Sequence, residues 1–112
     1  MTLSEKQHIF AQNLAKLLLH IESVGLMCSI GEVERTKEQA ELYAKEGKGI
    51  ADSLHCKRLA ADIFLFANNV YLEKKEDYEP MGKYWVTLHP MNRWGGSFKT
   101  RADYVHFEMQ DI

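Results

Sequence analysis

The sequence contains few residues of the kinds that cross-link a chain, break its helices or give it a strong charge. Its 112 residues include only two cysteines and two prolines. Cys28 and Cys56 form no Cys-x-x-Cys pair, which argues against a disulfide framework and against a thiolate zinc finger. Fourteen basic residues oppose 16 acidic ones, so the net charge is −2 and no basic stripe is present. This charge balance gives no support to electrostatic binding of nucleic acid.

Long apolar runs are missing as well. The longest apolar stretches, 14–21 and 59–67, are too short and too interrupted to cross a bilayer, so we expect no stable membrane insertion. The first ten residues lack the apolar centre of a signal peptide. We therefore expect a protein that is cytoplasmic when it is synthesised.

The residues that are present suit a packed globule. Hydrophobic residues make up 46% of the chain and aromatic residues 11%, which excludes disordered and low-complexity classes. A hydrophobic core with its covering layers uses about 100 residues, so we expect residues 1–112 to form a single domain. We also expect that domain to be a monomer.

Local patterns predict alternating helices and strands. Ser4 with Gln7 and Thr36 with Gln39 have the spacing of capping boxes, and Pro80 suits the first turn of a third helix. The expected elements in chain order are a helix at 4–22, a strand within 26–33, a helix at 36–46, a hairpin of 59–67 with 70–72, a helix near 79–89 and a strand at 104–109. This order predicts an α+β fold with about three helices and a small, mainly antiparallel sheet.

An aspartate interrupts the apolar strand of the predicted hairpin. With the two-residue period of a strand, Asp62 shares its face with Phe64 and Phe66. An ionised carboxylate in apolar surroundings needs a cation or several hydrogen-bond donors facing it. A basic neighbour such as Lys57 or Arg58 would meet that need in a purely structural way.

Two histidines suggest another partner for this carboxylate. In the last strand Tyr104, His106 and Glu108 share one face, and His55 lies seven residues before Asp62. Two histidines and one aspartate are a typical ligand set of a catalytic zinc ion that keeps its fourth position open for water. A hydrogen-bonded structural histidine is the alternative for either ring. The pattern predicts a zinc site in a cleft on the sheet.

Four short motifs together resemble the zinc D-alanyl-D-alanine carboxypeptidase family. They are Ser-x-His at 53–55, an aspartate seven residues later, Trp-Gly-Gly at 94–96, and an aspartate three residues before a histidine within 103–106. That family includes D,D-dipeptidases and phage endolysins that act as L-alanyl-D-glutamate endopeptidases. The resemblance spans roughly residues 26–109.

The resemblance implies a role for several residues. His55, Asp62 and His106 match the three zinc ligands of the family, and Asp103 matches its general base. Arg35 matches an arginine that the family uses on a substrate carbonyl or carboxylate.

Five other residues are candidates, and three of them have two interpretations. Gln39 and Ser53 fall at positions that line the cleft in the family. Trp94 can stack on substrate or pack the core, and His89 can border the cleft or interact with a helix C-terminus. Glu108 can orient a ligand histidine or be a solvated strand residue.

The sequence departs from the family pattern at one position, and one spacing constrains the last strand. Arg58 stands where many relatives have a glycine, and we expect its side chain to narrow the cleft or to pair with a carboxylate of the cleft wall. Asp103 and His106 are an odd number of residues apart, so a straight strand would point them to opposite faces. The strand is therefore expected to begin after Asp103.

The resemblance implies a zinc-dependent hydrolase of peptidoglycan stem peptides. An L-alanyl-D-glutamate endopeptidase of the endolysin type fits best, reaching the cell wall through a holin-type release partner. A D-alanyl-D-alanine carboxypeptidase or dipeptidase is the alternative within this class. A non-catalytic wall-binding module of the same fold is the alternative from another class.

Overall fold

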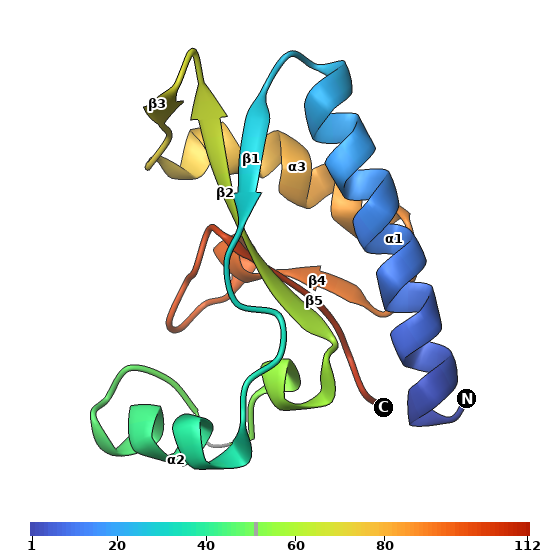
Figure 1. Cartoon of the computed structure of the whole chain (residues 1–112), viewed down its shortest axis with the longest axis vertical. Coiled ribbons are helices and arrows are strands. Elements are labelled where there is room, and N and C mark those ends of the chain that lie inside the picture. Colours follow the sequence, from blue (N-terminus) through green and yellow to red (C-terminus); the bar gives the residue numbers. More distant parts are fainter. Residues whose placement is uncertain (51) are drawn as a thin grey trace.

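The computed structural model describes residues 1–50 and 52–112 as three α-helices and a small antiparallel sheet (Figure 1). This confirms the predicted α+β class. The elements are α1 (Leu3–Ser23), β1 (Met27–Ile30), α2 (Lys37–Lys45), the 3-10 turn η1 (Leu54–Lys57), β2 (Ala60–Ala67), β3 (Val70–Tyr71), α3 (Lys75–Thr87), β4 (Asn92–Trp94), the 3-10 turn η2 (Gly95–Ser97) and β5 (His106–Met109).

The long strand β2 organises the sheet. The strand order is β1-β2-β5-β4, with β3 also paired to β2, and all of these pairings are antiparallel. One end of β2 pairs with β1 and β3, and the other end pairs with β5 (Figure 1). At that second end the register sets Asp62 directly opposite His106.

The two faces of β2 differ in burial. Ile63 and Leu65 are fully buried, whereas Phe64 and Phe66 are only half-buried. Asp62 therefore lies on the open face of the sheet, because it alternates with the buried residues. The buried face packs against α1 and α3, which lie together in Figure 1.

The first helix begins with a different capping box from the one predicted. Thr2 Oγ1 accepts a hydrogen bond from the Glu5 amide at 3.1 Å, and the Thr2 amide donates to the Glu5 carboxylate at 3.0 Å. The predicted box at Ser4 and Gln7 is wrong, because Ser4 already lies inside α1. Gln7 instead donates its side-chain amide to the Lys57 carbonyl at 2.7 Å, which ties α1 to η1.

The third helix begins four residues before its predicted start at 79. The Lys74 amide donates to the Asp77 carboxylate at 3.1 Å, and this contact caps the helix. Pro80 consequently lies in the second turn and not in the first. The cost is one helical hydrogen bond, to the carbonyl of Glu76.

Two further boundaries bear on the site. Thr36 caps α2 as predicted, because its Oγ1 accepts from the Gln39 amide at 3.1 Å. Strand β1 is shorter than predicted, although the Gly31 amide still donates to the Asp62 carbonyl at 2.7 Å. Within residues 1–50 and 52–112, no helix combines the length and apolarity that a membrane span requires.

Candidate metal centre

Three side chains from different parts of the chain converge on the open face of the sheet. His55, Asp62 and His106 each offer one ligand atom, and these atoms all lie within 4.8 Å of one another. His55 Nε2 is 3.4 Å and His106 Nδ1 is 3.5 Å from Asp62 Oδ1. Atoms bound at about 2.0–2.2 Å to one tetrahedral zinc ion are separated by about 3.3–3.6 Å. Both distances to Asp62 Oδ1 thus match those expected between ligands of one ion.

The turn η1 fixes His55. Ser53 Oγ caps this turn by accepting from the His55 amide at 3.2 Å, and the ring itself is 2% exposed. His55 Nδ1 lies 3.0 Å from the Val33 carbonyl. A carbonyl can only accept, so Nδ1 carries a proton and Nε2 is the ring nitrogen that faces Asp62.

The strand register fixes the other two groups. Asp62 and His106 are cross-strand neighbours, so their side chains project from the same face. His106 Nε2 lies 2.7 Å from Glu108 Oε1, which leaves Nδ1 facing Asp62. The three groups are therefore held by backbone structure and not by one flexible loop.

Electrostatics in the cluster favour a bound cation. Burial alone would raise the pKa of Asp62, but His106 and His55 lower it to about 2. Burial would lower the pKa of His106, yet the carboxylates of Asp62 and Glu108 raise it to about 9. Without an ion the cluster thus holds a proton, and a metal ion would displace that proton on binding.

The surroundings of one carboxylate oxygen show whether a metal ion fits the cluster. Asp62 Oδ1 is buried and has no hydrogen-bond partner among the described residues. When both histidines are neutral, this carboxylate oxygen has no donor, and a metal ion would satisfy it. The structural alternative, in which Lys57 or Arg58 pairs with Asp62, is wrong. Lys57 pairs with Asp111 at 2.5 Å, and Arg58 is exposed. Two histidine nitrogens and one carboxylate oxygen are a donor set that suits zinc.

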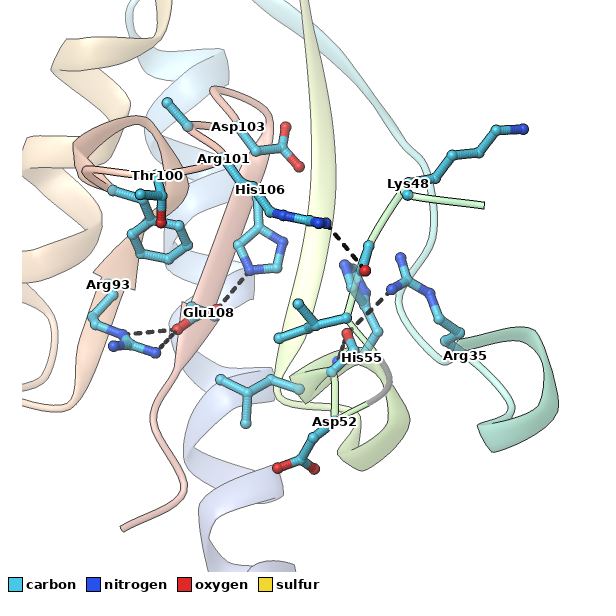
Figure 2. Close-up of a pocket in the computed structure, with 17 residues that line it drawn as sticks. Arg35, Lys48, Asp52, His55, Arg93, Thr100, Arg101, Asp103, His106 and Glu108 are labelled. Carbon is cyan, nitrogen blue, oxygen red and sulfur yellow. Dashed lines mark hydrogen bonds and ion pairs between the residues drawn. The ribbon is translucent and has the colours of Figure 1, made fainter. Parts of the chain in front are cut away.

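His55 and His106 of the cluster line a cleft of about 660 Å³ (Figure 2). Segments 47–50 and 52–55 form one wall, and residues between 93 and 108 form the other. Asp103 lines this cleft beside His106. Burial raises the pKa of the Asp103 carboxyl, and the nearby charge of Asp62 raises it further. Asp103 is therefore a stronger base than an ordinary aspartate.

Gly95 sets the position of Asp103. The Asp103 amide donates to the Gly95 carbonyl at 3.0 Å, and the His106 amide donates to the Asp103 carbonyl at 3.2 Å. A Cβ on Gly95 would lie 2.4 Å from the Asp103 carbonyl oxygen, so this close approach requires glycine. Strand β5 begins at His106, after Asp103, as the odd spacing predicts.

Arg35 and Ser53 also line the cleft. Arg35 Nε donates to Glu32 at 2.5 Å, and one terminal nitrogen lies 3.2 Å from Ser53 Oγ. The guanidinium carbon sits 5.1 Å from the centre of the Tyr43 ring. These contacts hold a planar cation in place next to His55.

The structure does not bring the remaining three candidates to the cleft. Gln39 is a half-buried residue of α2, and His89 accepts a hydrogen bond from the Met91 amide at 3.1 Å just beyond α3. Trp94 is 5% exposed and donates its indole N–H to the Tyr104 carbonyl at 2.8 Å. None of them is among the described residues that line the cleft.

The structure decides between the two interpretations of Glu108, and it adds two arginines of the cleft that the sequence analysis does not identify. Glu108 is 5% exposed and contacts His106, so the interpretation as a solvated strand residue is wrong. Arg93 pairs with Glu108, and Arg101 donates to the Gly49 carbonyl at 3.1 Å across the cleft (Figure 2). The Arg93 contact follows from the register of β4 on β5, which local sequence patterns do not determine.

Arg58 takes a backbone conformation that glycine adopts without strain. Its φ of 56° and ψ of 39° place it in the left-handed region at the end of η1. The side chain is exposed and does not line the cleft, so the expected narrowing of the cleft is not observed.

Replacing Arg58 with glycine should stabilise the fold. Relief of the left-handed strain exceeds the extra chain entropy of glycine, and we expect a gain of about 1 kcal/mol in the free energy of unfolding. Chemical denaturation measures this, with Arg58→Ala as the control that removes the side chain but keeps the Cβ. Equal stability of the two variants would contradict the strain argument.

The fold is similar to that of a solved structure. The chain resembles the crystal structure of the L-Ala D-Glu endopeptidase ChiX from Serratia marcescens, with a TM-score of 0.66 and 20% sequence identity. The match covers 76% of this chain and 68% of that one. At this identity the likeness establishes the fold alone.

A comparison with family models identifies the family of the chain. The model of the D-alanyl-D-alanine carboxypeptidase family matches residues 46–109, more than half of the chain, and the protein belongs to this family. The matched range contains His55, Asp62, Asp103 and His106. The resemblance drawn from the four motifs is thereby confirmed. A comparison with curated proteins gives no significant match.

Proposed function

We propose that this protein is a zinc-dependent peptidase that hydrolyses the stem peptides of peptidoglycan. The observation that carries the proposal is the Asp62 oxygen that lacks a hydrogen-bond partner and lies beside two histidines, both of which line the same cleft as Asp103. Family membership supports peptidase chemistry, and the ChiX likeness supports a wall peptide as substrate.

The proposed cofactor is zinc. His55 Nε2, Asp62 Oδ1 and His106 Nδ1 would hold Zn²⁺. A zinc ion held there would acidify a bound water and polarise the scissile carbonyl. The two histidine rings keep their other nitrogens on the Val33 carbonyl and the Glu108 carboxylate, so both rings are oriented before an ion arrives.

Asp103 and Arg35 would carry out the remaining steps. Asp103 takes the proton of the attacking water as the new C–O bond forms. It returns that proton to the amide nitrogen as the C–N bond breaks, so the free amine leaves neutral. Arg35, held by Glu32 and Ser53, offers N–H donors to a substrate carbonyl oxygen or carboxylate.

The most specific form of the proposal is an L-alanyl-D-glutamate endopeptidase of the endolysin type. Such a protein is made in the cytoplasm, acts as a monomer and reaches the wall through a holin-type partner. The likeness to ChiX, an L-Ala D-Glu endopeptidase, supports this choice of scissile bond. The description of the matching family favours the alternative, a D-alanyl-D-alanine carboxypeptidase.

Digestion of purified peptidoglycan separates these activities. The zinc-loaded protein should expose new N-terminal amines on D-glutamate, detected by amine labelling and chiral amino-acid analysis. Release of free D-alanine would instead establish the carboxypeptidase. A chelator-treated sample serves as the control. If zinc-loaded protein yields neither product, the proposed function is overturned.

A further inference from the structure

The sheet register builds a line of four polar side chains that begins at the metal cluster. Asp62 pairs across β2 and β5 with His106. Glu108 lies two residues further along the same face of β5, and Arg93 of β4 is its cross-strand partner. Alternation along β5 and pairing across two strand interfaces therefore fix the order Asp62, His106, Glu108, Arg93.

Each link in this line is a close contact. His106 Nε2 lies 2.7 Å from Glu108 Oε1. Arg93 Nε donates to Glu108 Oε2 at 2.8 Å, and a terminal nitrogen of Arg93 contacts the same oxygen. The two carboxylate oxygens thus have separate partners, one the histidine and the other the arginine (Figure 2).

The surroundings leave Glu108 few other orientations. Its side chain is 7% exposed, and the residue opposite it on β2 is the fully buried Ala60. The Arg93 guanidinium lies 5.4 Å from the centre of the Phe98 ring, and that ring lies 6.0 Å from the His106 ring. Arg93 therefore restrains His106 along two routes, through a carboxylate and through an aromatic ring.

We propose that Arg93 is a positioning residue for the metal centre. By occupying Glu108 Oε2 it aims Oε1 at His106 Nε2, which fixes the ring so that Nδ1 points at Asp62 Oδ1. Arg93 touches neither the ligand atoms nor the space between them, so its effect passes through Glu108 and Phe98. The inference rests on the proposed zinc site, and it adds a residue that no ligand spacing identifies.

Zinc affinity tests this role without any substrate. Arg93→Gln removes the charge and the forked donors but keeps a polar, unbranched side chain, and Arg58→Gln makes the same change at an exposed arginine outside the cleft as the control. Loss of a group that supports a metal ligand typically lowers metal affinity by about 10–100-fold. We expect about a tenfold rise in the zinc dissociation constant for Arg93→Gln, measured by competition with a chromophoric chelator, and no change for Arg58→Gln.

Two readouts separate positioning from general structural support. Arg93→Lys should recover part of the zinc affinity because it keeps a cation near Glu108, and zinc affinity is compared at a temperature at which thermal unfolding shows the metal-free Arg93→Gln protein to be fully folded. In the zinc-loaded protein, NMR should show faster solvent exchange of the His106 Nε2 proton in Arg93→Gln. An unchanged dissociation constant and exchange rate would overturn the role of Arg93 while leaving the proposed function intact. Failure of the wild type to bind zinc would overturn both.

Discussion

Replacing Asp103 with asparagine should lower peptidase turnover by about 10²–10⁴-fold, the contribution typical of a positioned general base. Asparagine has nearly the shape of aspartate but cannot accept the proton of the attacking water. The backbone contacts that position residue 103, with Gly95 and His106, involve only main-chain atoms and survive the change. Zinc should remain bound, because Asp103 is outside the ligand cluster. Release of peptide amines from peptidoglycan and metal analysis of the same sample measure the two effects.

This variant also distinguishes an enzyme from a binding module. A non-catalytic wall-binding protein would bind peptidoglycan equally well with either residue and would show no turnover in the wild type. His106→Ala is the matched comparison, because it should lose zinc and activity together. Full activity of Asp103→Asn would mean that another group is the base.

The grouping of His55, Asp62 and His106 could be predicted partly from alternation along strands and partly from the resemblance to a known family. A carboxylate within an apolar strand and a histidine on the last strand indicate a shared face before any pairing is known. Pairing then sets Asp62 opposite His106, and a short turn capped by Ser53 brings in His55. The overall α+β class follows from the same periodicities.

What local patterns could not determine depends on competition between nearby groups. Two adjacent capping boxes compete for the start of α1, and the one at Thr2 prevails because it satisfies the amides that come first. At α3 the Asp77 cap overrides the preference of Pro80 for a first turn. The contact of Arg93 with Glu108 could not be predicted for a different reason, because it is fixed only by the register of a three-residue strand.

The Trp-Gly-Gly motif is part of the family pattern, but its role in this fold is to pack the interior. Gly82 of α3 and Gly96 of η2 approach the indole of Trp94 so closely that a Cβ on either would lie 2.2 Å and 2.1 Å from ring atoms. The glycines let the backbone of α3 and of η2 lie directly against the indole. An indole enclosed in this way has little surface left for stacking on a sugar or peptide.

Trp94→Ala should therefore reduce stability more than it reduces substrate binding. Truncating a buried tryptophan to alanine typically costs about 3–5 kcal/mol, a large fraction of the stability of a small protein. The indole also donates to the Tyr104 carbonyl, two residues before His106, so loss of the ring loosens the start of β5. Chemical denaturation of the metal-free protein measures the loss.

Gly82→Ala provides the complementary test from the other side of the ring. In an exposed helix, alanine is more favourable than glycine by about 0.8–1.0 kcal/mol, whereas overpacking a filled site costs about 1–3 kcal/mol. Because the added Cβ meets the rigid indole of Trp94, we expect net destabilisation, while Lys83→Ala on the exposed side of α3 should change stability little. If Trp94→Ala kept its stability and lost only kcat/KM toward peptidoglycan fragments, the ring would be a substrate platform and the packing argument would fail.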